Sequence, residues 1–424
     1  MIFHIDGNSF YASCEALFRP DLADKPIAVL SNNDGITIAL NQECKDLGFK
    51  RGDAYFKMNH EYEAKGVTVF SSNYTLYADL CLRINMIYNS FCPDVEMYSI
   101  DESFLFFPPW KNIDWVALGH EIKNEVAKQV HLPVAVGIAP TKTLAKICNK
   151  HAKKKDGVCY WHALNKEKTL KNYAVHDVWG IGQAKTKLLS RLNIKTAYDL
   201  QKMPLYEAKR HLTIQGFKTV QELGEVCAID RQVADRRKNI CCSKSFARGV
   251  STLVELETAL TEYVQQAVER MRKEGSACKV IMVYITTARS KNACNNEYYN
   301  EAREILPHVA NYLPDIVKTA RKLLHTIYRP GYSYRKVMVH LLGLEDDTNM
   351  QRDLFEQDDS KKQKAIMHVC DSINTKYGSG CLHMGTRNQI QDVQANGKKA
   401  NWHMQRNFLS PKYTTKLSDI PHVY

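Results

Sequence analysis

Two strand-like segments that carry carboxylates constrain the fold of this chain most. Residues 2–5 form a short, mostly apolar run that ends at Asp6. Residues 95–107 form a second run, with Asp101 and Glu102 in its middle. Because neighbouring side chains on a regular strand point to opposite faces, this pair can serve one site only if the sequence SIDES bends into a hairpin. The alternative is an Asp-Glu pair in a solvated turn.

Asp6, Asp101 and Glu102 together predict a site for divalent cations. Three carboxylates at strand ends can hold two such ions about 4 Å apart, the geometry of two-metal phosphoryl transfer. Mg²⁺ suits such a site because it prefers one or two carboxylates plus substrate phosphate oxygens to a closed protein cage.

Composition narrows the class of protein. A chain of 424 residues is long enough for roughly two to four domains. Its net charge of +12 suits a polyanionic partner, although many unrelated proteins are as basic. Thirteen cysteines without a CxxC spacing favour reduced thiols in the cytosol over a zinc site or a disulfide framework. We see no signal peptide and no run long enough to span a membrane.

The chain divides into four regions and a tail. Residues 1–165 contain three strand candidates with helices between them, and 18–75 within this region are rich in turns. Residues 166–232 predict short helices. Residues 240–348 predict the order β-α-β-β-α-β, with strands near 240–246, 279–287, 298–305 and 335–342 and helices at 254–273 and 314–328. From about 349 the sequence is polar and predicts a tail that is partly structured at best.

The segment TKTLAKICNKHAKKK predicts a basic helix. Its lysines recur at helical spacing, and no acidic residue occurs from 142 to 155. A solvated face is the usual explanation for such a pattern. Because like charges at this spacing repel and no acid on the segment compensates them, we favour a polyanion facing the helix.

The segment DVWGIGQAKTKLL predicts a helix, a Gly-Ile-Gly turn and a second helix. A turn that exposes backbone N–H groups at a helix N-terminus can bind a phosphate without reading bases. The residues concerned are Gly180 and Gly182, with Lys185 after them. A plain helix connector is the alternative.

Seven segments together give a specific resemblance. DGNSFYASCEALFRPDL, KPIAVLSNNDG, FSSNYTLYAD, YSIDESF, VGIAPTKTLAK, DVWGIG and the tail segment LSPKYTTKLSDI occur in order along the chain. They resemble the Y-family translesion DNA polymerases and, within that family, the UmuC type, the catalytic subunit of bacterial DNA polymerase V.

The resemblance implies an α+β multidomain fold, the right-hand polymerase. It assigns a ferredoxin-like palm to 1–17 and 76–165 and small fingers to 18–75. A helical thumb with a helix-hairpin-helix takes 166–232, and a little finger of order β-α-β-β-α-β takes 240–348. Residues 349–424 form a C-terminal tail with clamp-binding and accessory-subunit-binding segments.

The resemblance also implies site residues. Asp6, Asp101 and Glu102 would be catalytic and bind two Mg²⁺ ions, and the carbonyl of Gly7 would complete one metal shell. Tyr11 would act as a steric gate that excludes a 2′-hydroxyl, although a core aromatic is the alternative.

The resemblance implies that the ammonium group of Lys153 contacts the nucleotide triphosphate. Many Y-family enzymes carry a Tyr and an Arg on the helix after the fingers turn, whereas this chain has Gln42 and Lys45. Lys45 keeps a positive charge without the bidentate geometry of Arg. The UmuC type also lacks that Tyr-Arg pair. The glycines of the Gly-Ile-Gly turn and Lys185 would contact the DNA duplex.

The partners implied are primer-template DNA and dNTP, a UmuD′-like dimer, the β sliding clamp and a RecA filament, with no membrane. Gln351, Leu354 and Phe355 resemble a clamp-binding peptide. Apolar residues further along the tail favour a surface for the accessory dimer, and docking onto the chain's own core is the alternative. They are Ile366, Met367, Val369, Leu382, Trp402, Phe408, Leu409 and Tyr413.

The function expected is error-prone, template-directed translesion synthesis in the SOS response, without proofreading. We expect a bacterial cytoplasmic enzyme, associated with the nucleoid when active. A non-catalytic DNA-binding subunit is a second hypothesis, which the presence of all three carboxylates disfavours. A third is another palm enzyme, such as a nucleotidyl cyclase, which the basic helix and the C-terminal domain disfavour.

Overall fold

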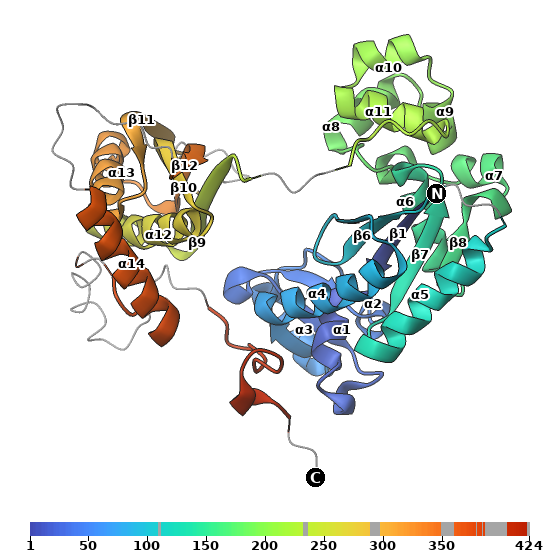
Figure 1. The fold of residues 1–424 in the computed structure, drawn as a ribbon, viewed down its shortest axis with the longest axis horizontal. Coiled ribbons are helices and arrows are strands. Elements are labelled where there is room, and N and C mark those ends of the chain that lie inside the picture. The colour runs from blue at the N-terminus through green and yellow to red at the C-terminus, as the bar shows by residue number, and fades with distance from the viewer. Residues whose placement is uncertain are drawn as a thin grey trace. The chain divides into compact units, whose positions relative to one another are not determined.

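The computed structural model describes residues 1–108, 112–231, 236–288, 297–348, 360–378, 380–383, 385 and 405–421. It forms two compact units (Figure 1). Unit 1 comprises 1–233 together with 405–424, and unit 2 comprises 234–404. The region after 349, expected as one tail, therefore contributes described residues to both units. Within the described residues, no helix is long and apolar enough to cross a membrane.

Unit 1 is built on a five-stranded sheet with the order β5-β6-β1-β7-β8. β1 lies between β6 and β7 and is antiparallel to both. β5 and β6 pair antiparallel around the turn 98–101, which confirms the predicted hairpin. The strands are β1 (Ile2–Gly7), β5 (Val95–Met97), β6 (Glu102–Phe106), β7 (Val134–Ala139) and β8 (Val158–Tyr160).

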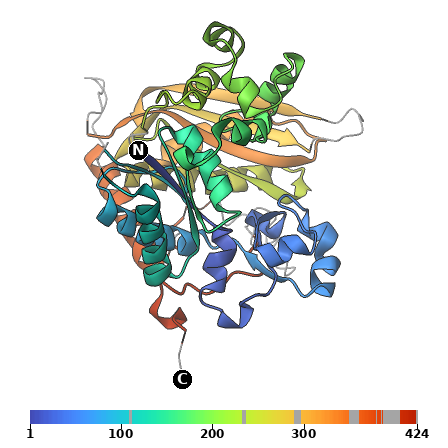
Figure 2. The same ribbon diagram turned by 90° about the vertical axis from the view of Figure 1, so that its right-hand side faces the viewer.

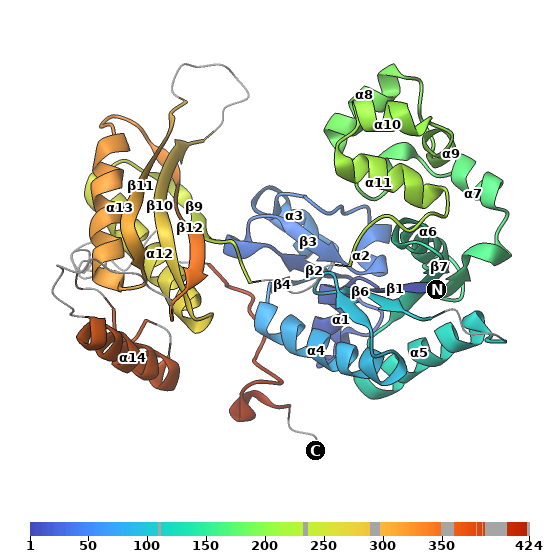
Figure 3. The same cartoon turned by 45° about the horizontal axis from the view of Figure 1, so that its top comes forward.

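Helices cover both faces of this sheet. Figure 3 shows α1 (Phe10–Ala16), α4 (Tyr74–Phe91) and α5 (Trp115–Val130) below it and α6 (Lys142–Ala152) above it. Side chains of β1 alternate between the two faces, since Phe3 and Ile5 pack with α4 and α5 whereas Ile2 packs with α6. The residues of β1 that share the face of Ile2 therefore point toward the basic helix.

A glycine lets α6 approach the sheet closely. A Cβ on Gly137 of β7 would lie 2.1 Å from the carbonyl oxygen of Ala145 and 2.3 Å from the nitrogen of Asn149. Any side chain at this position would push α6 away, so the position of the helix depends on Gly137.

The segment between α1 and α4 forms a small sheet of order β3-β2-β4. β2 is antiparallel to β3 and parallel to β4. In the turn before β3, Asn33 and Asp34 have positive φ angles of 63° and 49°, which agrees with the turn chemistry expected for SNNDG. The elements are β2 (Ile27–Leu30), β3 (Thr37–Leu40), β4 (Thr68–Ser71), α2 (Gln42–Asp46) and α3 (Tyr55–Ala64).

Short helices after β8, green in Figure 2, bury their apolar residues in one core with α6. The segment before Gly180, expected as a helix, is a single 3₁₀ turn at Val175–Asp177. That expectation was wrong because the chain is extended at Val178 and does not continue the turn. The helices are α7 (Lys166–Lys171), α8 (Gln183–Arg191), α9 (Ala197–Gln201), α10 (Leu205–His211) and α11 (Ile214–Leu223).

Unit 2 has a four-stranded antiparallel sheet with the order β11-β10-β12-β9. Its helices α12 and α13 bury their apolar faces against the sheet (Figure 3). The predicted order β-α-β-β-α-β is confirmed. The elements are β9 (Asn239–Val250), α12 (Leu253–Lys273), β10 (Ser276–Thr287), β11 (Tyr299–Ala310), α13 (Leu313–Ile327) and β12 (Tyr334–Asp346).

The region after unit 2's sheet contains a regular helix, α14 (Ser360–Tyr377), where little order was expected. Met367 is buried in the core of unit 2. Arg272 of α12 donates two hydrogen bonds to the carboxylate of Asp371, at 2.8 and 2.6 Å. Anchoring of this kind orders a polar helix whose own sequence carries only a weak apolar stripe.

Candidate active site

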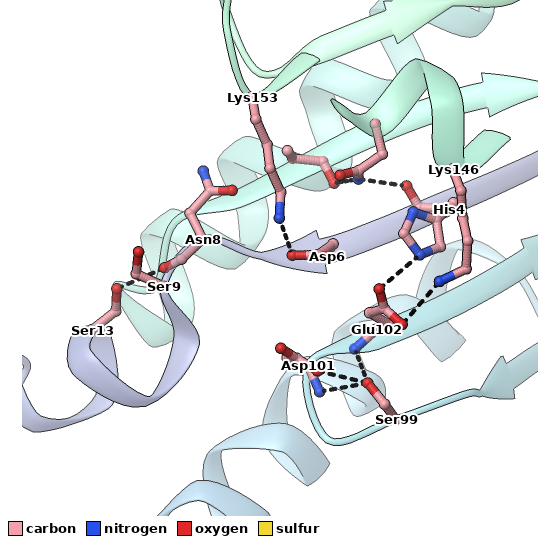
Figure 4. A network of polar contacts seen from close by, with 12 residues as sticks. His4, Asp6, Asn8, Ser9, Ser13, Ser99, Asp101, Glu102, Lys146 and Lys153 are labelled. Atoms are coloured by element: carbon pink, nitrogen blue, oxygen red, sulfur yellow. Dashed lines mark hydrogen bonds and ion pairs between the residues drawn. The ribbon is translucent and has the colours of Figure 1, made fainter. Parts of the chain in front are cut away.

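Strand register brings two of the predicted carboxylates together. Asp6 of β1 lies directly opposite Glu102 of β6 (Figure 4). Asp101 ends the turn before β6, and its backbone carbonyl accepts a hydrogen bond from the N–H of Gly7 at 2.9 Å. Ser99 fixes this turn, since its hydroxyl donates to Asp101 Oδ1 at 2.6 Å and accepts from the N–H of Glu102 at 3.1 Å. The hairpin thus holds both members of the Asp-Glu pair beside Asp6.

The three carboxylates line one cavity of about 510 Å³. It also contains the other residues assigned to metal and nucleotide binding, together with one basic residue that sequence reasoning missed, Arg51. The predicted residues on this cavity are Asp6, Gly7, Tyr11, Lys45, Asp101, Glu102 and Lys153. A basic pair, Lys50 and Arg51, in the turn after α2 was the available signal for Arg51.

Each lysine of α6 forms an ion pair with an acid from another element. Lys146 contacts Glu102 at 3.0 Å, and Lys153, just after the helix, contacts Asp6. The other pairs are Lys142 with Glu96 and Lys150 with Asp177. The argument that no acid compensates these lysines was therefore wrong, because it considered only acids within the segment. The fold brings the ammonium groups of Lys146 and Lys153 to the carboxylates of the cavity.

The two opposed carboxylates differ in electrostatic environment. Burial raises the pKa of Asp6 to about 6, against the opposing effect of Lys153. Burial would also raise the pKa of Glu102, but His4 and Lys146 together lower it to about 2. Glu102 therefore holds its charge over a wide pH range, whereas the charge of Asp6 depends on a nearby cation.

His4 lies behind this pair, although no histidine was assigned a role from the sequence. Its Nε2 is 3.7 Å from Glu102 Oε1, and its side chain is 2% exposed. Burial lowers the pKa of His4 to about 4, so the ring is neutral at physiological pH. One ligand atom from each of His4, Asp6 and Glu102 falls within a 4.8 Å cluster. Strand periodicity was the missed signal, since His4 and Asp6 share one face of β1.

The donor set fits a hard divalent cation. The cavity offers carboxylate oxygens from Asp6, Asp101 and Glu102, the type of ligand that Mg²⁺ prefers. The lysines paired with Asp6 and Glu102 supply positive charge at the places where a cation would act. Asp6, Glu102 and Asp101 can therefore hold metal ions once a phosphate-bearing substrate adds its own oxygens.

The ring of Tyr11 packs against other aromatic rings and also lines the cavity. The two explanations given from the sequence, a steric gate and a core aromatic, are therefore compatible. Its ring stacks on Tyr77 at 4.5 Å between centroids and meets Tyr74 edge-on at 5.9 Å. Burial raises the pKa of Tyr11 to about 12. Nearby, Lys45 Nζ donates to Ser9 Oγ at 3.1 Å, whereas Gln42 turns away and donates to Asp46.

The residues predicted to contact the DNA duplex, Gly180, Gly182 and Lys185, do not line this cavity. Gly180 has a φ of 86°, which favours glycine, and its carbonyl accepts a hydrogen bond from Lys185 Nζ at 2.9 Å. Gly182 is the N-cap of α8. The residues predicted to bind the clamp, Gln351, Leu354 and Phe355, lie outside the described residues.

Comparison with known proteins identifies the class. Residues 5–150 match the impB/mucB/samB family, 237–354 match the C-terminal domain of that family, and 364–423 match a domain of unknown function, DUF4113. Protein UmuC of Salmonella typhimurium is 39% identical over 99% of both chains, and Protein MucB of Escherichia coli is 35% identical over 98% of both. DNA polymerase IV of Oceanobacillus iheyensis is 26% identical and covers 93% of this chain.

Solved structures support the fold at lower identity. A Y-family DNA polymerase chimera of Dbh and Dpo4 covers 81% of this chain, with a TM-score of 0.64 and 19% identity. An insertion ternary complex of Dbh DNA polymerase covers the same share, with a TM-score of 0.53. The fold is thus that of a Y-family DNA polymerase.

The chain belongs to the impB/mucB/samB family and is a UmuC-type member of the Y-family polymerases. It is a DNA-directed DNA polymerase of the translesion class. Polymerases of this class generally use divalent metal ions.

Proposed function

We propose that this chain extends primers past damaged template bases by two-metal nucleotidyl transfer, as part of the SOS response and without proofreading. The observation that carries this proposal is the placement of Asp6 opposite Glu102, with Asp101 on the same cavity. Three carboxylates and a phosphate-sized space are the requirements of in-line phosphoryl transfer with two Mg²⁺ ions.

Asp6, Asp101 and Glu102 hold the metal ions in this proposal, and the carbonyl of Gly7 completes one shell. Bound Mg²⁺ would lower the pKa of the primer 3′-hydroxyl and neutralise charge on the triphosphate. Ser99 keeps Asp101 and Glu102 in place through the hairpin turn. Lys146 and Lys153 balance the carboxylates before substrate arrives, and Lys153 then turns to the triphosphate.

The nucleotide binds on the side of the cavity formed by the segment between α1 and α4. Lys45 and Arg51 supply positive charge to the triphosphate there, and Arg51 adds the planar donor group that Lys45 lacks. Tyr11 lies under the sugar and excludes ribonucleotides by contact with their 2′-hydroxyl. Its stacking on Tyr77 supports this role, because a gate must resist displacement.

The proposed architecture is the right hand. The palm is 1–17 with 76–165, the fingers are 18–75, the thumb is 166–232 and the little finger is 240–348. Primer-template DNA contacts the Gly180–Gly182 turn and Lys185 of the thumb. The exposed glycine turn at the start of α8 supports this contact, since it leaves backbone N–H groups accessible to a phosphate.

The partners proposed are a UmuD′-like dimer, the β sliding clamp and a RecA filament, in the bacterial cytoplasm at the nucleoid. Gln351, Leu354 and Phe355 are proposed to bind the clamp. Of the apolar residues expected to bind the accessory dimer, five remain exposed and keep that role: Ile366, Val369, Leu382, Phe408 and Leu409. Trp402 lies outside the described residues. Met367 and Tyr413 pack on the chain itself, as the alternative explanation required.

Primer extension tests the proposal. The purified full chain, with the accessory proteins present, should extend a primer opposite a lesion in the presence of Mg²⁺ and stop when a chelator is added. Cyclic nucleotide formation from triphosphates without DNA would instead support the cyclase hypothesis. DNA binding without any extension would support the non-catalytic subunit.

A further inference from the structure

The C-terminal segment 405–420, here called the C-terminal strap, belongs to unit 1 (Figures 1 and 2, red). Leu409 forms a parallel bridge with Ser71 at the end of β4. The N–H of Ser71 donates to the carbonyl of Phe408 at 2.9 Å, and the N–H of Phe408 donates to Ser71 Oγ at 3.0 Å. The strap therefore extends the small sheet at its β4 edge.

A buried aspartate links the strap to the SNNDG turn. Asp34 accepts a hydrogen bond from the hydroxyl of Ser71 at 2.6 Å with one oxygen and from the N–H of Asn407 at 2.8 Å with the other. Asn33 Oδ1 accepts from the N–H of Gln405 at 3.0 Å. Three segments thus meet here: SNNDG at 31–35, SSNY at 71–74 and the strap. None of them contributes a carboxylate to the cavity.

The strap also holds the residue at which α4 begins. Asn73 is the N-cap of this helix, where its Oδ1 accepts from the N–H of Leu76 at 3.3 Å. Its amide nitrogen is directed at the strap, with the hydroxyl of Ser410 at 3.0 Å and the carbonyl of Pro411 at 3.3 Å. Asn73 is 5% exposed, so no water replaces these partners easily.

The first turn of α4 supports Tyr11 directly. Tyr74 follows Asn73, and Tyr77 lies one turn along, so the start of this helix places two of the rings that touch Tyr11. The hydroxyl of Tyr77 donates to Glu15 Oε1 at 2.6 Å. Because Glu15 and Tyr11 are both on α1, this bond ties the helix of the proposed gate to the helix that supports it.

The strap reaches α1 as well. Tyr413 stacks on Phe18, just after α1, at 4.5 Å between centroids and an interplanar angle of 13°. The other oxygen of Glu15 is buried without a hydrogen-bond partner among the described residues, and Ser410 lies close enough to lower the pKa of this carboxyl, which burial raises to about 7. Both helices that hold Tyr11 therefore contact the strap.

We propose that the C-terminal strap positions the ring of Tyr11 and thereby sets the preference of the enzyme for deoxyribonucleotides. No strap residue lines the cavity of the carboxylates as far as the chain is described, so Ser410 and Tyr413 are positioning residues. The proposal rests on the proposed role of Tyr11 as the sugar gate. It assigns a role to the C-terminal part of residues 364–423, the region that matches a domain of unknown function.

The test compares sugar selectivity, the ratio of kcat/KM for a deoxyribonucleotide to that for the matching ribonucleotide, among variants of the full chain. Ser410→Ala combined with Tyr413→Ala removes strap contacts, and Tyr77→Phe removes the bond to Glu15 while keeping the stacked ring. Tyr413→Phe retains the stack on Phe18 and serves as the rescue variant. Thr415→Ala changes an exposed side chain of the same strap and is the matched control.

Selectivity should fall roughly threefold to tenfold in the double variant and in Tyr77→Phe, the coupling expected between residues in contact. Most of the change should be a gain with ribonucleotides, whereas a merely structural role would lower kcat/KM equally for both sugars. Tyr413→Phe and Thr415→Ala should keep the wild-type ratio. If the double variant does not fold, Ser410→Ala alone decides, because it removes the hydrogen bond that Asn73 donates to the strap side chain.

Tyr11→Ala separates this inference from the function on which it rests. If Tyr11→Ala leaves selectivity unchanged, the gate itself is wrong and the inference falls with it. If Tyr11→Ala relaxes selectivity while the double variant and Tyr77→Phe keep the wild-type ratio, the gate stands and the strap has no part in it.

Discussion

At the scale of single residues, the cavity of the three carboxylates contains charges that are compensated by ion pairs. Asp6 and Glu102 each have an ammonium partner, Lys153 and Lys146 respectively. A divalent cation that binds these carboxylates has to displace or share those partners. The lysines therefore influence both the charge of the free site and its affinity for metal ions.

Lys146→Met should make the site bind divalent cations more tightly. The change keeps an apolar stem over the rings of Tyr98 and Trp179 but removes the competing charge on Glu102. The Mg²⁺ concentration for half-maximal extension should fall up to about fivefold, since a partly exposed ion pair is worth up to about 1 kcal/mol. Lys150→Met, which removes the pair with Asp177 and the cation over the ring of Tyr173, is the control and should leave that concentration unchanged.

Glu15→Gln should change how stability depends on pH. Burial raises the pKa of Glu15 from its ordinary value of 4.5 to about 7, so the folded state binds this proton more tightly than the unfolded state. The stabilisation that the protonated Glu15 contributes is fully present below the pKa of the unfolded state and is lost as pH rises through the pKa of about 7 in the folded state. The advantage of Gln over Glu should therefore grow by on the order of 2–3 kcal/mol between about pH 5 and about pH 8.

Thermal or chemical unfolding of the wild-type chain and of Glu15→Gln at the two pH values measures this difference. The hydroxyl of Tyr77 can still donate its hydrogen bond to the amide oxygen that the substitution introduces, so the comparison isolates the charge. A stability difference that stays constant with pH would show that the carboxyl of Glu15 titrates normally.

At the scale of elements, the residue pattern within a segment predicted its strands and helices. The hairpin at SIDES followed from the requirement that Asp101 and Glu102 serve one site, and the order β-α-β-β-α-β followed from strand-like and helix-like segments that alternate along the chain. The same reasoning predicted the helix α6 but missed the four acids that pair with Lys153 and the lysines of this helix, because these acids come from β1, β5, β6 and a 3₁₀ turn. Contacts between distant segments leave no periodic signal in the sequence around either partner.

Gly137→Ala should damage the enzyme through the position of α6. The added methyl group would overlap the backbone of Ala145 and Asn149, which can only shift as part of the helix. We expect a loss of about 1–3 kcal/mol or more in stability, the usual cost of overpacking. Extension should also fall, because Lys146 and Lys153 move with α6.

Gly35→Ala is the control for that variant. Its added Cβ would meet neighbouring atoms only at 3.8 Å or beyond, which is ordinary contact. Melting temperature and extension rate of the two variants give the comparison. Equal behaviour of Gly137→Ala and Gly35→Ala would mean that α6 tolerates displacement and that the packing argument is wrong.

At the scale of the whole molecule, the main surprise lies after residue 349. Sequence analysis treated this region as one tail because it is polar and lacks periodicity. The structure instead assigns α14 to unit 2 and the C-terminal strap to unit 1. The strap is held mainly by hydrogen bonds of Asp34, Ser71 and Asn73 to its backbone, and such contacts depend on position in space rather than on residue pattern.

The residues that line the cavity of the three carboxylates were predicted more completely than the residues around it. Resemblance placed Asp6, Tyr11, Asp101 and Glu102 correctly on one cavity, because each belongs to a short motif at the end of a strand or the start of a helix. Residues that act on the site from behind or from another segment, His4 and Arg51, were missed. Their identities carry no motif, and only the three-dimensional structure brings them to the site.

The central claim is that the opposed carboxylates carry metal-dependent chemistry rather than DNA binding. The most direct measurement is primer extension by Glu102→Gln beside Glu121→Gln, an exposed change on α5, with primer-template affinity measured on the same samples. Glu102→Gln should extend at least about a hundredfold more slowly, because losing a metal ligand costs more than losing a residue that orients one. Its DNA affinity should stay within about twofold of wild type, since phosphate contacts supply most of that affinity. Extension by Glu102→Gln at the rate of Glu121→Gln would contradict the assignment of this cavity as the active site.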